Sequence, residues 1–226
     1  MGLVLALAAG SIAACGSNSD NGKEGATLTV LNYGKYIDED AVKQFEKETG
    51  IKVKYEEYES PEEMYTKYKA GSIDYDVICS SEYMVEKLIN EGEVLQMDYA
   101  GMENYKNLDP TIIDMSSAYD KDHNYSLPYF YGTLGLLYNK TEVDPSVVKS
   151  WDCLWDPTYE DEIIMENSVR DTFAPALIDL GYSLNETDET HLREALDVLK
   201  KQKDDKIVYG YYVDETADAM IGEEAL

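Results

Sequence analysis

From Thr27 onward, short β-branched or apolar runs alternate with amphipathic helical patterns, and this alternation restricts the fold more than any other feature. The first half contains predicted strands at 27–30, 51–55, 76–79 and 94–95, separated by predicted helices at 38–48, 60–71 and 83–90. A strand–helix order of this kind is typical of a mostly parallel sheet whose faces are covered by helices. We therefore expect an α/β fold.

Capping signals support these helix boundaries. Ser60-Pro61-Glu62-Glu63 has the capping-box pattern with proline at the first helical position, so a helix is predicted to begin there. Gly50 follows the first helical pattern at a position where a left-handed residue commonly ends a helix.

Two strand-to-helix loops carry tyrosines. Tyr33 and Tyr36 lie in the loop at 31–38, and Ser81 and Tyr83 lie in the next such loop. Ligands of open α/β sheets collect at the carboxyl ends of the strands, which is where these loops are expected. On spacing alone, tyrosines that simply cover the sheet edge are the simpler interpretation.

The second half begins with a long segment, 125–138, whose pattern predicts an extended strand and which contains Gly132 and Gly135. We expect it to cross between two lobes near residues 131–133, which predicts a first α/β lobe at 27–131 and a second, partial one at 132–226. The elements predicted after the crossing are a helical turn at 151–155, strands at 163–165 and 207–211, and helices at 169–180, at 188–201 and from 214. Two α/β lobes joined by an extended crossing form the plan of a bilobal binding protein.

The charge balance narrows the functional classes. There are 46 Asp and Glu residues against 19 Lys and Arg, which gives a net charge of −27. A field of this sign repels nucleic acid and attracts cations, whether metals or organic amines. Tyrosine accounts for 20 residues against 3 phenylalanines and 2 tryptophans, and it suits wet binding sites because it has an apolar face and a polar tip.

No sequence motif indicates catalysis or a cofactor. Phosphate-binding loops, dinucleotide fingerprints, zinc-protease motifs and serine nucleophile elbows are all lacking. Cys79 and Cys153 have no C-x-x-C spacing, so we expect free thiols and no metal site. A secreted glycoside hydrolase with paired carboxylates is the alternative from another class, but nothing in the sequence sets two carboxylates facing each other.

The N-terminus has the features of an export signal. Residues 1–14 are apolar or small and too few to span a bilayer, and 15–26 are rich in Gly, Ser and Asn, as in a flexible tether. Ile12-Ala13-Ala14-Cys15-Gly16 resembles the lipobox of bacterial lipoproteins, which implies cleavage before Cys15 and a lipid anchor on its thiol. No Lys or Arg precedes the apolar run, which favours a truncated or mis-assigned start over a cytosolic protein with an apolar leader.

Several ordered stretches between Thr27 and Leu226 resemble the bacterial extracellular solute-binding proteins, and within them the spermidine/putrescine-binding lipoproteins of ABC transporters. The matching stretches are 32–36, 45–53, 58–60, 64–65, 75–77, 81–83, 107–110, 125–129, 150–151, 154–155, 170–171 with Phe173, and 180–183. The resemblance implies a type II periplasmic-binding-protein-like bilobal fold. In that family further ligand residues follow the terminal helix, so the chain resembles a fragment that lacks the C-terminal part.

The resemblance also implies a set of ligand-binding positions. These are Tyr33, Gly34, Tyr36, Ser81, Tyr83, Ser168 and Asp171. Two residues depart from the family pattern: Ser168 stands where an aspartate is usual, and Lys35 stands where a glutamate is usual. Asp171 has a second possible role, because Ser168-Val169-Arg170-Asp171 is itself a capping-box pattern.

The expected function is therefore that of a monomeric, lipid-anchored receptor outside the cytoplasm, in the periplasm or at the cell surface. It would capture spermidine or putrescine, deliver the ligand to an ABC permease and carry out no chemistry. Because of Ser168 and Lys35, a receptor for another small solute, such as an amino acid or a metal chelate, is the alternative within this class.

Overall fold

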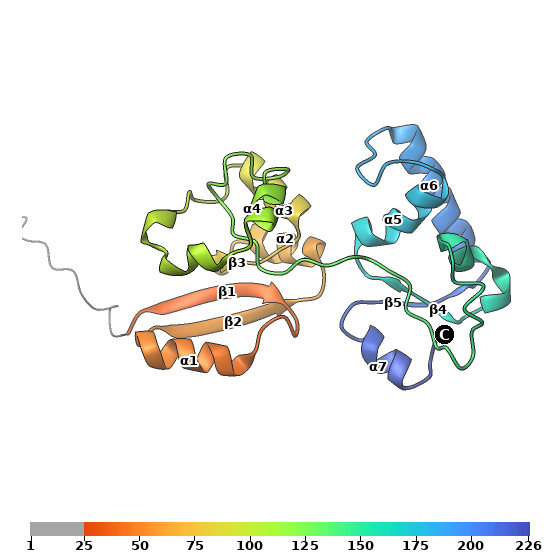
Figure 1. The fold of residues 1–226 in the computed structure, drawn as a ribbon, viewed down its shortest axis with the longest axis horizontal. Coiled ribbons are helices and arrows are strands. Elements are labelled where there is room, and N and C mark those ends of the chain that lie inside the picture. The colour runs from red at the N-terminus through yellow and green to blue at the C-terminus, as the bar shows by residue number, and fades with distance from the viewer. Residues whose placement is uncertain (1–24) are drawn as a thin grey trace, which may run out of the picture.

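Two separate parallel sheets organise residues 25–226, the part of the chain that the computed structural model describes (Figure 1). We call the part built on the sheet β2-β1-β3 the first lobe and the part built on the sheet β4-β5 the second lobe. The strands are β1 (Thr27–Tyr33), β2 (Lys52–Tyr58), β3 (Val77–Ile78), β4 (Ile163–Glu166) and β5 (Val208–Tyr212). The predicted signal peptide, the lipidated Cys15 and all of the tether except residues 25 and 26 lie outside the described residues.

The first lobe confirms the predicted strand–helix alternation. β1 is the central strand and pairs in parallel with both β2 and β3. Helix α1 lies on one side of the sheet, and α2 and α3 lie on the other (Figure 1). Leu31 of β1 is fully buried in a core with Tyr58, Met64, Met84 and Leu88. The helices are α1 (Glu39–Thr49), α2 (Pro61–Lys69), α3 (Glu82–Asn90) and α4 (Pro110–Ser116).

The predicted capping box begins α2. Ser60 Oγ accepts a hydrogen bond from the backbone N–H of Glu63 at 3.2 Å. The Glu63 carboxylate reaches back and accepts from the backbone N–H of Glu59 at 2.8 Å. Two backbone N–H groups near the start of the helix thus have side-chain partners.

Replacing Ser60 by alanine should lower the free energy of unfolding by about 1 kcal/mol, because the N–H of Glu63 loses its acceptor. Ser168 is a matched control, since it occupies the N-cap of α5 but makes no side-chain cap hydrogen bond. Urea denaturation should show a smaller loss for Ser168→Ala than for Ser60→Ala. Equal losses would contradict the assignment of the stabilisation to the cap bond.

The second lobe packs its helices around a single apolar core. The core is formed by Leu154, Met165, Ala176, Leu177, Ala195 and Leu199, and Trp151 and Trp155 pack against it. The helices are α5 (Val169–Asp179), α6 (Glu189–Asp204) and α7 (Thr216–Ile221). The predicted turn at 151–155 is the 3-10 helix η3 (Trp151–Trp155), and the other short 3-10 helices are η1 (Tyr99–Gly101), η2 (Glu103–Asn107) and η4 (Pro157–Tyr159).

Two local predictions were wrong. Val94 and Leu95 do not form a strand: Val94 packs against the core of the first lobe, Leu95 is 89% exposed, and neither residue pairs with a strand in the described part of the chain. The segment 125–138 passes from the first lobe to the second (Figure 1), but it contains no strand. Its backbone lies beside no strand with which it could form a ladder in the described part of the chain.

Asp120 holds the start of this crossing segment. It is 2% exposed, and its carboxylate accepts hydrogen bonds from the backbone N–H groups of Asn124, Tyr125 and Ser126 and from the Ser126 hydroxyl at 2.8–3.0 Å. Burial by itself would raise the pKa of Asp120, but the four hydrogen bonds favour the charged form and lower the pKa overall. The entry to the crossing therefore depends on an ionised carboxylate.

Asp120→Asn should destabilise the protein by about 1.5–3 kcal/mol at neutral pH, because an amide cannot accept all of these bonds. The folded-state pKa of Asp120 is below its unfolded value, so its stabilisation is present above that unfolded value, near pH 4, and is lost as the pH falls through the folded pKa. Chemical denaturation at several pH values should show the two proteins converging in acid. A gap that stays constant down to the lowest pH would contradict this role.

Candidate functional site

The aromatic part of the site comes from the first lobe. Tyr33 ends β1, and its hydroxyl hydrogen-bonds to Ser81 Oγ at 2.6 Å. The Tyr33 ring lies 5.2 Å from the ring of Tyr36 and 4.5 Å from that of Tyr58. Tyr36 also contacts Phe130 of the crossing segment, edge to face at 5.3 Å. The first loop therefore presents a continuous group of ring faces where the chain leaves for the second lobe.

The Ser81 hydroxyl bonds to Tyr33 and does not cap its own helix. Ser81 is the N-cap of α3, but its side chain accepts no hydrogen bond from the first turn. Its Oγ instead meets the Tyr33 hydroxyl across the carboxyl ends of two neighbouring strands. Sequence reasoning placed both residues in the site, and the structure brings them together.

Tyr83 follows Ser81 by two residues, in the first turn of α3, and both its hydroxyl and one face of its ring have a contact partner. Its hydroxyl donates to Glu62 Oε1 of α2 at 3.0 Å. The guanidinium carbon of Arg170 lies 5.4 Å from the centre of its ring. Burial, followed by the charge of Glu62, raises the pKa of Tyr83, so the phenol stays protonated and acts as a donor.

The second lobe contributes residues from the start of α5. Ser168 is buried at the N-cap, and its hydroxyl has no hydrogen-bond partner in residues 25–226. Asp171 lies in the first turn of α5 with its side chain exposed. The capping-box alternative for Asp171 is not formed, because Ser168 makes no side-chain cap bond and Asp171 has no reciprocal one in the described residues.

The charge of Asp171 contributes to the pKa shifts of one residue in each lobe. Burial raises the pKa of Tyr33, the hydrogen bond to Ser81 opposes the rise, and the charge of Asp171 adds to it. Burial also raises the pKa of Glu166, and the Asp171 charge raises it further. A carboxylate of the second lobe therefore acts on the central tyrosine of the first, next to a second carboxyl group.

Gly34 and Lys35 face the start of α7. A Cβ atom on Gly34 would lie 2.3 Å from Asp214 Oδ2, so only glycine allows this carboxylate to approach the loop as it does. The Lys35 ammonium lies 3.8 Å from Asp218 Oδ2, and both side chains are largely exposed. Lys35, whose positive charge departs from the family pattern, therefore has carboxylates of the second lobe as its neighbours.

Sequence reasoning missed four charged groups at this interface between the lobes: Glu62, Glu166, Arg170 and Asp214. Two of them had an available signal. Glu166 is the last residue of β4, and Asp214 follows β5 by two residues, so both lie at carboxyl ends of parallel strands. The same rule that selected Tyr33 would have selected them.

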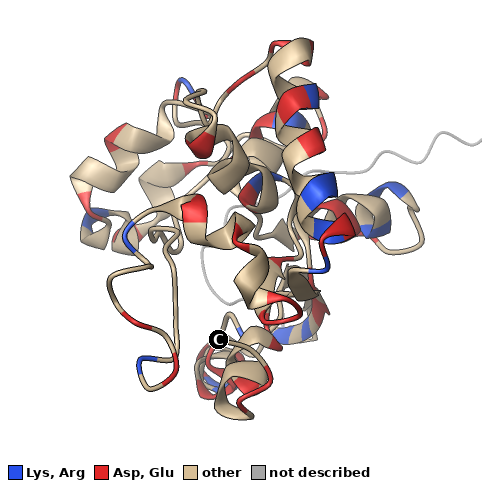
Figure 2. Cartoon of the chain, turned by 90° about the vertical axis from the view of Figure 1, so that its right-hand side faces the viewer, with Lys and Arg blue, Asp and Glu red and all other residues tan. Residues whose placement is uncertain are grey.

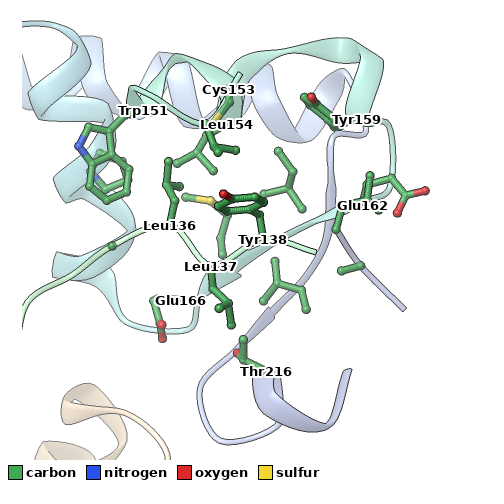
Figure 3. Close-up of a pocket in the computed structure, with 18 of the residues that line it drawn as sticks. Leu136, Leu137, Tyr138, Trp151, Cys153, Leu154, Tyr159, Glu162, Glu166 and Thr216 are labelled. Carbon is green, nitrogen blue, oxygen red and sulfur yellow. The ribbon is translucent and has the colours of Figure 1, made fainter. Parts of the chain in front are cut away.

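A cavity of about 170 Å³ lies within the second lobe, between the segment 134–138, η3 and β4 (Figure 3). Its lining is mainly apolar and includes Leu136, Leu137, Trp151 and Leu154. Among the predicted site residues, Asp171 alone lines it, and the predicted tyrosines do not. Tyr33, Tyr36 and Tyr83 therefore do not share this cavity with Asp171.

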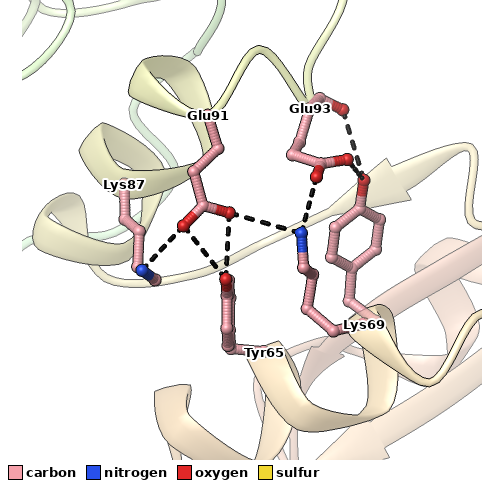
Figure 4. A network of polar contacts seen from close by, with 6 residues as sticks. Tyr65, Lys69, Lys87, Glu91 and Glu93 are labelled. Carbon is pink, nitrogen blue, oxygen red and sulfur yellow. Dashed lines mark hydrogen bonds and ion pairs between the residues drawn. The ribbon is translucent and has the colours of Figure 1, made fainter.

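Acidic side chains are spread over the helices of both lobes (Figure 2). Several lysines of the first lobe are already paired away from the site: Lys69 with Glu91 and Glu93, and Lys87 with Glu91 (Figure 4). This network ties α2 to the end of α3, and Tyr65 also donates to Glu91. Closer to the boundary between the lobes, Arg170 lies over the Tyr83 ring and Lys35 pairs with Asp218.

The cysteines behave as free thiols. Cys79 and Cys153 are each partly buried and form no disulfide with one another. Burial raises the pKa of Cys79 to about 11, which keeps the thiol protonated and unreactive at neutral pH. Between residues 25 and 226 no cluster of metal-ligating side chains occurs, and no helix there is long and apolar enough to cross a membrane.

Comparison with known families gives a match over most of the chain. Residues 40–225 match the family described as "Bacterial extracellular solute-binding protein". A spermidine/putrescine-binding periplasmic protein of Salmonella typhimurium is 37% identical over 198 residues, covering 86% of this chain and 56% of the relative. A putrescine/cadaverine-binding protein of Pseudomonas aeruginosa is 37% identical over 174 residues, with 74% of this chain and 49% of the relative covered. The chain thus spans about half the length of these relatives.

Solved structures agree with the bilobal fold. A chain from Listeria monocytogenes superposes with a TM-score of 0.81 at 36% identity, covering 89% of this chain and 61% of that one. The spermidine/putrescine ABC transporter substrate-binding protein PotD of Streptococcus pneumoniae gives a TM-score of 0.66 at 37% identity, with the same coverage. The predicted type II bilobal α/β fold is confirmed by these neighbours and by the two parallel sheets.

Proposed function

We propose that this chain, which belongs to the family of bacterial extracellular solute-binding proteins, captures a polyamine outside the cytoplasm and delivers it to an ABC importer. The names of its relatives, which bind spermidine, putrescine or cadaverine, support this choice of ligand. The protein would work by binding and release alone, as a monomer, without catalysis or a cofactor. Its partners would be the polyamine and the permease subunits.

The observation that supports the proposal is the presence of aromatic hydroxyls and carboxylates on the facing parts of the two lobes. Tyr33 bonded to Ser81 comes from the first lobe, and Asp171, whose charge contributes to the raised pKa values of both Tyr33 and Glu166, comes from the second. A polyamine is a string of ammonium groups separated by methylenes, so each part has a partner here. Carboxylates pair with ammonium groups, and aromatic rings cover methylenes and attract the cations.

The helix ends explain why several carboxylates are needed. α3 and α5 both begin at this interface, and helix N-termini carry partial positive charge that disfavours a cation. Asp171 in the first turn of α5 offsets that field, and burial, followed by the charge of Asp171, raises the pKa of Glu166. A bound ammonium would relieve the repulsion between these two acids.

Affinity must come from both lobes together. Micromolar binding requires about 8 kcal/mol, whereas a single cation–π contact supplies roughly 0.5–2 kcal/mol. We therefore propose that the predicted ligand positions act as one set on closure of the lobes, with the boundary between 27–131 and 132–226 as the hinge region. That set is Tyr33, Gly34, Tyr36, Ser81, Tyr83, Ser168 and Asp171. Export and anchoring through Cys15 belong to the same proposal.

Isothermal calorimetry on the full-length gene product tests the proposal, with putrescine, spermidine and an amino acid as separate titrants. We expect saturable binding of one polyamine per protein and no heat from the amino acid. Binding of the amino acid alone would favour the receptor for another solute, and hydrolysis of a glycoside would favour the enzyme. No heat from either polyamine would remove the polyamine claim and leave the family assignment intact.

A further inference from the structure

Four side chains form a continuous series of contacts from the first lobe to the second. Glu62 of α2 accepts from the Tyr83 hydroxyl at 3.0 Å. The Tyr83 ring lies under the guanidinium of Arg170, with 5.4 Å between the ring centre and Cζ. Arg170 Nη2 in turn donates to Asn185 Oδ1, in the connection between α5 and α6. Tyr83 and Arg170 thus join α3 of the first lobe to α5 of the second.

Arginine suits this position for two reasons. Its planar guanidinium can lie on a ring face while its N–H groups still donate at the edge, as one does here to Asn185. The negative face of an aromatic ring attracts a cation. Glu62, which holds the far end of the ring by its hydroxyl, fixes the ring orientation that Arg170 meets.

The contact also occupies a surface that a ligand would otherwise use. Tyr83 is one of the proposed ligand positions, yet one face of its ring already carries a cation of the protein itself. A polyamine ammonium near that face would meet the like charge of Arg170. The ring face of Tyr83 that Arg170 covers is therefore closed to a ligand ammonium.

We propose that Arg170 is a positioning residue that holds the two lobes together through the face of Tyr83 and does not contact the ligand. The consequence for polyamine affinity rests on the proposed function, whereas the contact between the lobes does not. A second charged contact between the lobes, Lys35 with Asp218 at 3.8 Å, joins two largely exposed side chains. The Arg170 contact differs because the guanidinium lies on a ring face and donates to Asn185 at the same time, so we assign the positioning role to Arg170.

Small-angle X-ray scattering of the ligand-free, full-length protein tests the contact without reference to any ligand. Arg170→Ala should increase the radius of gyration, and Arg170→Lys should restore only part of the compactness, because an ammonium can lie over the ring but cannot also donate to Asn185 as the planar guanidinium does. Arg193→Ala is the matched control, since Arg193 is an exposed arginine of α6 that pairs with Glu189. Circular dichroism checks that each variant keeps its secondary structure.

Calorimetry with putrescine and spermidine supplies the second readout. Arg170→Ala should weaken polyamine binding by about two- to fivefold, and adding Tyr83→Leu should then not increase the radius of gyration further. An Arg170→Ala protein as compact as Arg193→Ala, or fully additive effects of the two substitutions on the radius, would overturn the proposal. Absence of polyamine binding by the unsubstituted protein would defeat the proposed function, while the scattering result would still decide the role of Arg170.

Discussion

Asp171→Asn should lower the affinity of the full-length protein for putrescine or spermidine by about 10- to 100-fold in calorimetry. The substitution keeps the size of the side chain and removes the charge that acts on Tyr33 and Glu166. An ammonium enclosed between the lobes would then lack its carboxylate, and an unpaired buried charge is costly. Because Asp171 is exposed and makes no cap bond, stability should change little.

Asp204→Asn is the control for this experiment. Asp204 is an exposed aspartate at the end of α6, so its substitution changes the net charge equally without touching the site. It should leave the affinity within about twofold of the unsubstituted value, because exposed charges are well screened at physiological salt. If both variants lost affinity to the same extent, the effect would be one of overall charge, and Asp171 would have no specific role.

Leu31→Ala should lower the free energy of unfolding by about 2–5 kcal/mol, the largest stability effect expected in the first lobe. Leu31 lies at the centre of β1, which pairs on both edges, and its side chain is fully buried against Met64, Met84 and Leu88. The strands on either side fix the backbone, so the surrounding side chains can refill the space only in part. Denaturation followed by far-UV circular dichroism measures the change.

Leu95→Ala provides the same chemical change at an exposed position. The Leu95 side chain is 89% exposed, so its truncation should alter the free energy of unfolding by no more than about 0.5 kcal/mol. A loss at Leu95 comparable to that at Leu31 would mean that the core assignment is incorrect. Comparison of Leu31→Ala with Leu95→Ala therefore distinguishes the loss of stability that comes from burial from any general effect of shortening a leucine.

The elements that periodicity and capping define were predictable from sequence. Ser60 begins α2 through the bonds its pattern indicates, and Gly50 ends α1 in the left-handed conformation with φ 72°. The errors came where an extended pattern had no partner strand, at 94–95 and in the crossing segment. A single stretch of sequence records whether a strand is possible, but not whether a neighbour lies within hydrogen-bonding distance.

The site was predictable in part, for a related reason. Tyr33 and Ser81 meet because they lie at the ends of adjacent strands, which the strand order of one sheet determines. Arg170 meets Tyr83 because two lobes face each other, and no local pattern contains that information. Glu166 and Asp214 were accessible to the rule of strand ends but were overlooked because they belong to no resembling stretch.

The position of the two tryptophans has a practical consequence. Both pack against the core of the second lobe, while Tyr33, Tyr36, Tyr58 and Tyr83 belong to the first. Energy absorbed by these phenols reaches an indole by non-radiative transfer from one lobe to the other, and the efficiency of that transfer falls steeply with separation. Tyr182 packs against the same core as the tryptophans and transfers to them within the second lobe, so it adds a constant contribution. A change in the separation of the lobes would therefore appear as a change in sensitised indole emission above that constant level, without any attached dye.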